Sequence, residues 1–308
     1  MKKISLVIPY FGKLNRYQLF AINQLSLVDF LDVNVIVDRN VLEYSSILND
    51  ANVMDVATCF INDNLFGVQL SELKKYPYKL CDYKPFFNLI FKFEYHEYFA
   101  FCDLDCIYNP PVLNKLLSSI PKKVVGGEKG HFMIFDFDSL EKIQEVFLAK
   151  ADDYRKKNKI NLFTSERHFA LDEFLFLHRI LERLHSDGDI VWERCFFNPL
   201  LDLDYKNVLP KNWVDTELTF SLDSIMSNRS TSNYSYIHLQ KRKVIGDLQS
   251  INRIGFDNRG KVCLNETLGN RINLYAKITY KIDILLKRVK FRYGHHGIST
   301  RPSFDDLF

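Results

Sequence analysis

The sequence predicts an α/β protein whose core is a mixed, mostly parallel sheet flanked by helices. Two β-branched runs near the N-terminus, separated by a helical stretch, predict a βαβ unit. A short apolar run at 98–102 predicts a buried strand of the same sheet. The chain has 308 residues, 47% of them hydrophobic, so it can bury one large core or one core and a small appendage.

The first part of the chain alternates between predicted strands and helices. Strands are expected over 4–8 and 33–37, with a helix over 17–27 between them. A further strand is expected over 53–58. An aromatic-rich helix over 83–93 then leads into the apolar strand. This order is the opening of a doubly wound sheet.

The middle of the chain continues the alternation. Two prolines precede a short helix over 112–119, because proline is favoured in the first turn. Strands are expected over 124–125 and 131–137. Asp138 and Glu141 then resemble a capping box that would open a helix from 139 to about 150. A later helix, over 171–184, is apolar on most of its circumference and should be largely buried.

The composition restricts the cellular compartment and the classes of partner that can be expected. Six cysteines are scattered without C-x-x-C pairs, so neither a zinc ribbon nor a disulfide framework is indicated, and a reducing cytoplasm is expected. Residues 1–8 imitate a signal peptide, but the apolar run stops at Pro9 and is better read as the first strand. No stretch of the sequence is long and apolar enough to span a bilayer. Residues 152–159 mix acids with bases, so no nucleic-acid partner is expected.

The positive charge is concentrated near the C-terminus. Segment 271–292 carries seven basic residues and one acid, within a chain whose formal net charge is +3. Five of its apolar residues share one face of a predicted helix: Tyr275, Ile278, Ile282, Leu285 and Val289. Such a helix can lie on an anionic membrane surface, dock on its own domain or pair with another subunit. These three roles stay open.

Two aspartates follow the apolar strand directly. Asp103 and Asp105 are separated by one residue, so in an extended segment both side chains point to the same face. The C-terminal end of such a strand borders the ligand crevice of an α/β sheet. The pair can therefore converge on one divalent cation and a diphosphate. A second triplet, at 202–204, follows a segment that looks like a loop or a short edge strand and is the weaker candidate.

Several other segments complete a family pattern. They are Val7-Ile8-Pro9-Tyr10-Phe11-Gly12, residues 78–87, Gly130-His131-Phe132, Leu171-Asp172-Glu173-Phe174 and residues 238–243. Together with the aspartate pair and in this order, they resemble bacterial GT-A fold glycosyltransferases of capsule and lipopolysaccharide biosynthesis clusters, with a distant similarity to family 8 enzymes. The resemblance covers about residues 1–245. It implies a GT-A (Rossmann-like) nucleotide-sugar-binding catalytic domain over 1–262, followed by a basic amphipathic helical tail over 263–308.

The resemblance implies a place for the nucleotide. Pro9, Tyr10 and Phe11 would line the base and ribose of a nucleotide sugar. Asp38, at the end of the second strand, would hydrogen-bond the base or the ribose. A carboxylate at that position could also be a simple turn residue.

The resemblance also implies a metal site. Asp103 and Asp105 would hold Mn²⁺ or Mg²⁺ across the diphosphate, and His238 would be the third protein ligand, because Mn²⁺ accepts imidazole beside carboxylates. The alternative for His238 is a structural role in a strand. Cys102 and Cys106 flank the aspartates and are expected to be packing residues.

Basic residues would neutralise the departing diphosphate. Lys241, Arg242 or Lys243 would act together with the ion. Lys84 is a second candidate at the donor site, and its alternative role is that of a solvated lysine at a helix start.

Other residues would serve the acceptor and the sugar. Asp172 or Glu173, at the start of the buried helix, is the candidate catalytic base, although a carboxylate there could merely favour the helix dipole. If the anomeric configuration is retained, Asp172 would orient the sugar instead. Gly130 and His131 follow a glycine-rich turn and would contact donor or acceptor, or His131 would simply begin a strand.

The predicted function is a metal-dependent, hexosyltransferase-like enzyme of class EC 2.4. It would move a sugar from a nucleotide-diphosphate donor, such as a UDP-sugar, to a glycan or lipid-linked glycan acceptor of the bacterial surface. The expected location is the cytoplasm, and the inner face of the cytoplasmic membrane if the basic segment binds it. One alternative is a sugar nucleotidyltransferase, which would need a more glycine-rich phosphate loop than residues 9–13 provide. Another is an inactive glycan-binding or scaffold protein. A glycosidase is disfavoured, because its two carboxylates flank a bond and do not share an ion.

Overall fold

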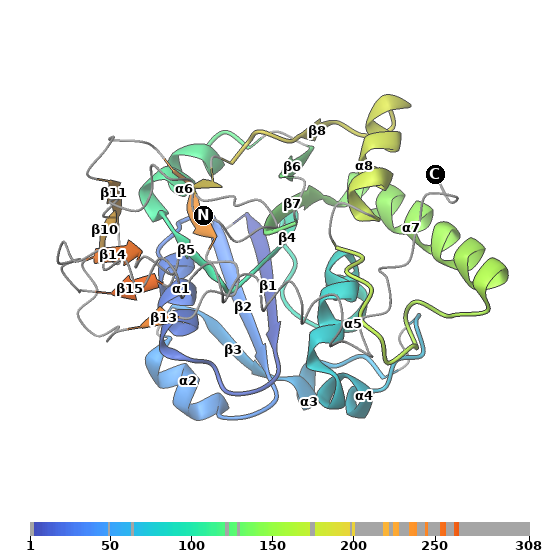
Figure 1. Ribbon diagram of the computed structural model, residues 1–308, viewed down its shortest axis with the longest axis horizontal. Helices are drawn as coiled ribbons and strands as arrows, with labels where there is room; N and C mark the ends of the chain where they lie inside the picture. Colours follow the sequence, from blue (N-terminus) through green and yellow to red (C-terminus); the bar gives the residue numbers. More distant parts are fainter. Residues whose placement is uncertain are drawn as a thin grey trace, which may run out of the picture.

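The computed structural model confirms the predicted fold class: a mixed, mostly parallel sheet flanked by helices (Figure 1). It describes residues 3–48, 50–62, 65–120, 123–127, 130–172 and 176–197, and beyond them the segments 199–200, 218–221, 224–227, 234–238, 244–245, 253–256 and 262–264. The largest sheet has seven strands in the order β3-β2-β1-β4-β7-β6-β8. These strands are β1 (Ile4–Tyr10), β2 (Leu31–Val37), β3 (Asn52–Asp55), β4 (Tyr98–Cys102), β6 (Val124–Gly126), β7 (Phe132–Asp136) and β8 (Trp192–Glu193).

The strand directions explain why the sheet is mixed. Strands β3, β2, β1 and β4 are parallel to one another, as are β6 and β8, whereas β7 runs antiparallel to both β4 and β6. Helices connect the parallel strands, because a parallel pair needs a crossover. The helices are α1 (Arg16–Ser26), α2 (Val41–Ile47), α3 (Val56–Cys59), α4 (Leu70–Lys75), the 3₁₀ helix η1 (Pro77–Phe86), α5 (Phe87–Ile90), α6 (Pro110–Leu117), α7 (Phe137–Asn158) and α8 (Leu177–Ser186).

Both faces of the sheet are buried. Alternate residues of β4 contribute to two hydrophobic clusters: Phe99 and Phe101 to one, and Tyr98, Ala100 and Cys102 to the other. Figure 1 shows α1 and α2 on one side of the sheet and α5, α7 and α8 on the other. Burial on both faces is why the strands read as continuous apolar runs in the sequence.

Two smaller sheets lie beyond the main one. The first joins β5 (Cys106–Tyr108), β12 (Tyr236–His238) and β9 (Pro199–Leu200), in the order β5-β12-β9. The second has the order β11-β10-β14-β15-β13, with β10 (Leu218–Ser221), β11 (Ser224–Ser227), β13 (Val244–Ile245), β14 (Arg253–Phe256) and β15 (Val262–Leu264). The strand-like run that ends at His238 is thus a strand.

Two predicted elements in the first half of the chain are wrong in detail. The helix expected over 83–93 is replaced by η1 and the short α5, with Pro85 inside η1. Proline has no N–H and its ring clashes with the preceding turn, so no regular α-helix runs from the start of η1 through Pro85. The strand expected over 53–58 ends at Asp55, whose side chain accepts a hydrogen bond from Ala57 N and caps α3.

Two later helices also differ from the prediction. Helix α7 begins at Phe137 and is capped by Asp136, whose carboxylate accepts from Ser139 N at 2.8 Å, so Asp138 and Glu141 do not form the expected capping box. The same helix continues to Asn158 and includes most of the charged segment 152–159. The helix expected from residue 171 begins only at Leu177.

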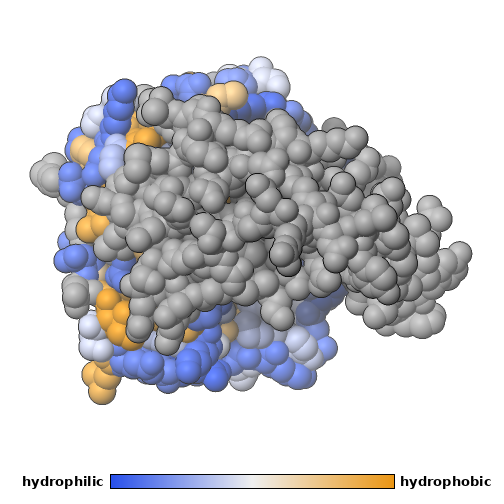
Figure 2. Space-filling model, turned by 60° about the vertical axis from the view of Figure 1, so that its left-hand side comes forward, coloured by the Kyte–Doolittle hydropathy of each residue, from blue (hydrophilic) through white to orange (hydrophobic). Residues whose placement is uncertain are grey.

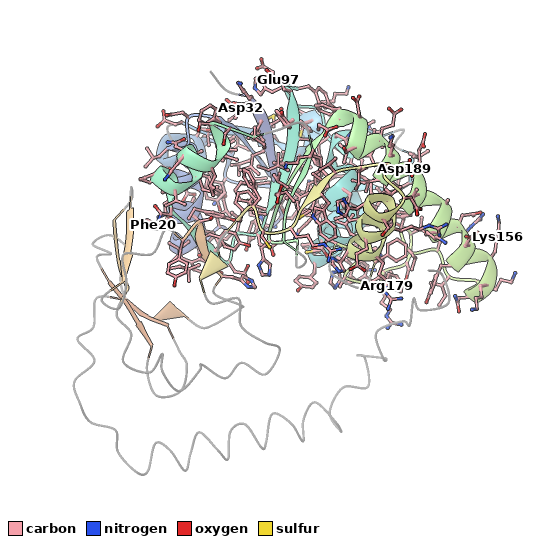
Figure 3. All side chains as sticks on the ribbon, turned by 90° about the horizontal axis from the view of Figure 1, so that it is seen from above. Phe20, Asp32, Glu97, Lys156, Arg179 and Asp189 are labelled. Atoms are coloured by element: carbon pink, nitrogen blue, oxygen red, sulfur yellow. The ribbon has the colours of Figure 1, made fainter. Side chains whose placement is uncertain are left out.

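The surface and the two edges of the sheet can be followed in the other views. On the face drawn in Figure 2, the described residues are mainly hydrophilic, with scattered hydrophobic ones. Figure 3 places Asp32 and Glu97 together at the edge where β2 and β4 begin, and Arg179 of α8 on the opposite side.

None of the described helices combines the length and apolar composition that crossing a bilayer requires.

Candidate active site

The strand order creates a switch point between β1 and β4. From β1 the chain moves outward to β2 and β3, and it returns to the other side of β1 as β4. In open α/β sheets, ligands bind outside the carboxyl ends of the strands where the order reverses. Strand β1 ends at Tyr10 and β4 ends at Cys102, so Asp103 emerges at this point.

The three predicted metal ligands lie together. Strand β5 follows the aspartates and pairs with β12 so that His238 is opposite Cys106. His238 Nε2 lies 3.4 Å from Asp105 Oδ1. Ligand atoms of Asp103, His131 and His238 all lie within 4.8 Å of one another, as do those of Asp105, Cys106 and His238. His131, predicted to contact substrate, therefore belongs to the same cluster.

The chemistry of this cluster fits a divalent cation. His238 is 8% exposed, and its Nδ1 has no hydrogen-bond partner among the described residues. Buried polar atoms are normally paired, so such an atom calls for a ligand. Carboxylates combined with imidazoles suit an ion such as Mn²⁺. Cys106 differs from these donors, because burial raises its pKa and favours the neutral thiol over the thiolate that metals bind.

Lys84 is a buried cation held between two carboxylates. Only 5% of the residue is exposed, so it is not the solvated lysine considered above. Its ammonium forms ion pairs with Asp103 and, at 2.6 Å, with Asp172 Oδ2. Burial would lower the pKa of Lys84, but the two carboxylates outweigh it and raise the pKa well above its usual value. The positive charge of Lys84 is therefore favoured by its surroundings.

For Asp103, in contrast to Lys84, burial outweighs the ion pair in setting the pKa. Burial raises the pKa of Asp103 to about 6, and the carboxylates of Asp105 and Asp172 also favour its protonated form, while Lys84 opposes this shift. The backbone of Asp103 is fixed on both sides: its N–H donates to His131 O at 2.8 Å, and its carbonyl accepts from Tyr108 Oη at 2.6 Å. Among these described side chains, three carboxylates, those of Asp103, Asp105 and Asp172, face one ammonium, that of Lys84. This excess of negative charge suits a site that receives a cation.

Asp172 faces Lys84 with one oxygen and has the other unoccupied. It is 5% exposed, and its Oδ1 has no hydrogen-bond partner in the described part of the chain. It precedes α8 by several residues, so the expectation that it sits in the first turn of a helix is wrong, and the dipole argument does not apply. Gly130 explains the close approach here, because it has φ +65° and a Cβ on it would lie 2.5 Å from Asp172 O.

Sequence reasoning missed a second buried ion pair that holds the Asp172 segment. Lys79 Nζ lies 2.9 Å from Asp82 Oδ2 and also donates to the carbonyls of Leu162 and Arg167. Asp82 accepts from two further backbone N–H groups at 3.0 Å, those of Phe169 and Leu171. The available signal in the sequence was a group of charged residues, Lys79, Asp82 and Lys84, inside an aromatic segment. The backbone groups that Lys79 and Asp82 bind lie more than 80 residues away, so the sequence did not reveal them.

The turn after β1 is organised by Asp38. Its carboxylate accepts from Gly12 N at 2.8 Å and pairs with Arg39 at 2.7 Å. Burial would raise the pKa of Asp38, but these hydrogen bonds with Arg39 and Gly12 lower it. The turn role is therefore visible in the structure. Phe11 packs in the core, while Pro9 and Tyr10 are half-buried at the end of β1.

Tyr17 of α1 is a further residue that the sequence did not single out. Burial raises its pKa, a hydrogen bond with Asn15 opposes this, and the charges of the Asp105 carboxylate and the Tyr10 phenol add to the upward shift. The charge state of Tyr17 is therefore coupled to those of Asp105 and Tyr10. Its place in an amphipathic helix gave no reason to choose it over other aromatic residues.

Several predicted residues lie outside the described part of the chain. They are Glu173, Lys241, Arg242 and Lys243, the second aspartate triplet at 202–204 and the basic segment 271–292. The roles predicted for them stay predictions.

A family model matches residues 6–265, which is most of the chain, and its description is a family of unknown function (DUF6625). The chain belongs to this family. No curated protein matches it.

Solved structures with a similar arrangement are glycosyltransferases. The apo form of GlyE from Streptococcus pneumoniae TIGR4 is 14% identical, with a TM-score of 0.35; the match covers 63% of this chain and 45% of GlyE, so this chain spans less than half of that protein. Mouse xyloside xylosyltransferase 1 is 11% identical, with coverages of 65% and 88% and a TM-score of 0.37. The galactosyltransferase LgtC, in complex with donor and acceptor sugar analogues, is 9% identical, with coverages of 76% and 86% and a TM-score of 0.35. All three TM-scores are below 0.5, and we therefore base the functional proposal on the side chains of this chain.

Proposed function

We propose that the protein is a metal-dependent glycosyltransferase that moves a sugar from a nucleotide-diphosphate sugar to a glycan acceptor. One observation carries the proposal. At the carboxyl end of β4, next to the switch point, two carboxylates and an imidazole from β12 meet beside a buried lysine. Such a set suits a cation and the diphosphate that it binds.

The residues can be assigned roles on chemical grounds. Asp103, Asp105 and His238 would hold Mn²⁺ or Mg²⁺, and the ion, when bound, would supply positive charge to the departing nucleoside diphosphate. Lys84 adds a cation that is already in place and needs no reorganisation. Lys241 and Lys243 are proposed to approach the same diphosphate.

Asp172 is the residue with spare hydrogen-bonding capacity. Lys84 occupies its Oδ2, and its Oδ1 is unpartnered within the described residues. It would accept a hydrogen bond from a hydroxyl of the donor sugar or take the proton of the acceptor hydroxyl. Gly130 has no Cβ and therefore lets the backbone of Asp172 approach closely, and Glu173 is the neighbouring candidate for the same task.

The nucleotide would bind at the end of β1. Pro9, Tyr10 and Phe11 are proposed to line the base and the ribose, and Asp38 to position this turn through Gly12 N. UDP is the proposed nucleotide. The same hydrogen bond speaks against a sugar nucleotidyltransferase, because a phosphate-binding turn would keep its amide N–H groups for the ligand.

The acceptor and the location are proposed from the charge pattern of the chain. The basic segment 271–292 would bring the enzyme to the anionic inner face of a bacterial cytoplasmic membrane, where lipid-linked precursors of capsule or lipopolysaccharide are glycosylated.

Calorimetric titration of UDP and GDP, with and without Mn²⁺, tests the proposal. We expect binding to wild type that requires Mn²⁺ and is lost in Asp105→Asn. The matched control is Asp152→Asn, which removes a carboxylate from the exposed surface of α7 and should bind as wild type does. Absence of metal-dependent binding to wild type would contradict the proposal and favour the inactive glycan-binding or scaffold alternative.

A further inference from the structure

We propose that His131 is a fourth protein ligand of the metal ion, and that the resulting pair of imidazoles makes the site select Mn²⁺ over Mg²⁺. This inference rests on the proposed function, because it concerns the same site. It differs from the sequence-based expectation, in which His131 contacts donor or acceptor and only His238 provides nitrogen.

The backbone holds His131 against the first aspartate. His131 precedes β7, which pairs antiparallel with β4, and its carbonyl accepts from Asp103 N at 2.8 Å. Gly130 before it has φ +65°, which sets the direction of the chain as it enters β7. Two strands of the main sheet thus fix the distance between the imidazole and the carboxylate.

The side chain of His131 faces the ligand cluster. It is 8% exposed, its ring centroid lies 3.6 Å from that of His238, and its ligand atom is within 4.8 Å of those of His238 and Asp103. A residue that reads an exchangeable sugar from an open crevice would be more accessible. Two buried imidazoles and a carboxylate at these separations are arranged to share one ion.

The charges around the cluster increase the share of the metal affinity that the two imidazoles contribute. Asp103 is already paired with Lys84, so part of its negative charge is neutralised before an ion arrives. A site that relies on neutral nitrogen donors discriminates between ions more strongly than a site built from carboxylates, because Mg²⁺ prefers oxygen ligands whereas transition ions accept imidazole. Preference for Mn²⁺ is the expected consequence.

Metal titration of the full-length protein without nucleotide tests the inference. Free Mn²⁺ is measured by electron paramagnetic resonance, and Mg²⁺ binding is measured by its competition with Mn²⁺. His131→Asn should weaken Mn²⁺ binding by at least about 10-fold, because loss of a residue that merely supports a metal ligand already costs about 10- to 100-fold. Mg²⁺ binding should change less than about threefold, because Mg²⁺ gains little from the imidazole. His96→Asn, at the opposite edge of the sheet beside Asp32, is the control and should leave both ions unaffected.

A second variant keeps the test independent of folding losses. His131→Asp replaces nitrogen by oxygen and should lower the ratio of Mn²⁺ to Mg²⁺ affinity below that of wild type. Unchanged Mn²⁺ affinity in His131→Asn, or an equal loss for both ions, would overturn the inference while Mn²⁺-dependent UDP binding still supported the proposed function. A wild type that binds neither ion, with or without UDP, would overturn both.

Discussion

Two buried lysine–aspartate clusters are centred on Lys79 and Lys84, five residues apart in η1, and they differ in how completely their polar atoms are hydrogen-bonded. In the first, Lys79 has three oxygen partners, and Asp82 accepts from Lys79 and from two backbone N–H groups. In the second, Lys84 joins Asp103 and Asp172, and one oxygen of Asp172 has no partner among the described residues. A satisfied cluster supports the fold, whereas an unsatisfied one can receive a ligand.

The pKa values of the two lysines follow the same division. Burial lowers the pKa of Lys79, which Asp82 opposes only in part. Burial acts on Lys84 in the same direction, but two carboxylates outweigh it and raise its pKa well above the usual value. The second cluster therefore stores an excess of negative charge around one cation. We interpret the first as a structural clamp on the segment before Asp172 and the second as the donor site.

The largest effect on transfer is expected from Asp172→Asn. The amide keeps the size of the side chain but cannot take a proton, so turnover should fall by about 10²- to 10⁴-fold if Asp172 is the base. Metal-dependent UDP binding, measured by calorimetry, should stay within about threefold of wild type. Loss of nucleotide binding together with turnover would mean that Asp172 belongs to the metal and nucleotide machinery.

The largest effect on stability is expected from Lys79→Met. It removes the cation that pairs with the buried Asp82 carboxylate and the donor to two carbonyls, so the free energy of unfolding should fall by about 3–5 kcal/mol. Urea unfolding followed by circular dichroism measures it. A loss below about 1 kcal/mol would show that the first cluster is not a structural clamp.

Gly130→Ala should cause an intermediate loss of stability, because Gly130 contacts the Asp172 segment, which both clusters hold. Positive φ alone destabilises an alanine, and the new Cβ would also lie 2.5 Å from Asp172 O. Gly188→Ala is the matched control, because Gly188 has φ +79° and nothing within 4 Å of an added Cβ. We expect a greater loss of stability in Gly130→Ala than in Gly188→Ala, by about 1–3 kcal/mol in urea unfolding. Equal losses would show that the segment simply moves away.

Removal of 271–308 should have the smallest effect on the site. We expect sedimentation with anionic vesicles to decrease strongly, with UDP binding unchanged, because the basic segment supplies the attraction to the surface. Neutral phosphatidylcholine vesicles are the control. Unchanged sedimentation with anionic vesicles after deletion would rule out the membrane role of the tail.

The sequence predicted the part of the site that depends on local pattern. An apolar strand followed by Asp103 and Asp105 indicated both the buried strand and the carboxylates at its end, because strand periodicity and the position of ligand crevices are general. The strand placement that was considered for His238 is also confirmed. These features need no knowledge of long-range contacts.

The rest depended on contacts between distant segments. Asp82 binds backbone groups 87 and 89 residues away, which no local pattern encodes. The capping box predicted at Asp138 and Glu141 did not form, because β7 ends at Asp136 and that residue caps α7 instead. Tyr17 approaches Asp105 only because α1 packs beside β5, an arrangement set by the tertiary fold.

The most direct test of the proposed activity is the release of nucleoside diphosphate from a panel of nucleotide sugars in the presence of bacterial lipid-linked glycans. The account predicts release from one donor that requires Mn²⁺, stops when the ion is chelated, and is absent in Asp105→Asn but not in Asp152→Asn. Release that is insensitive to chelation and to Asp105→Asn, or no release from any donor, would contradict it.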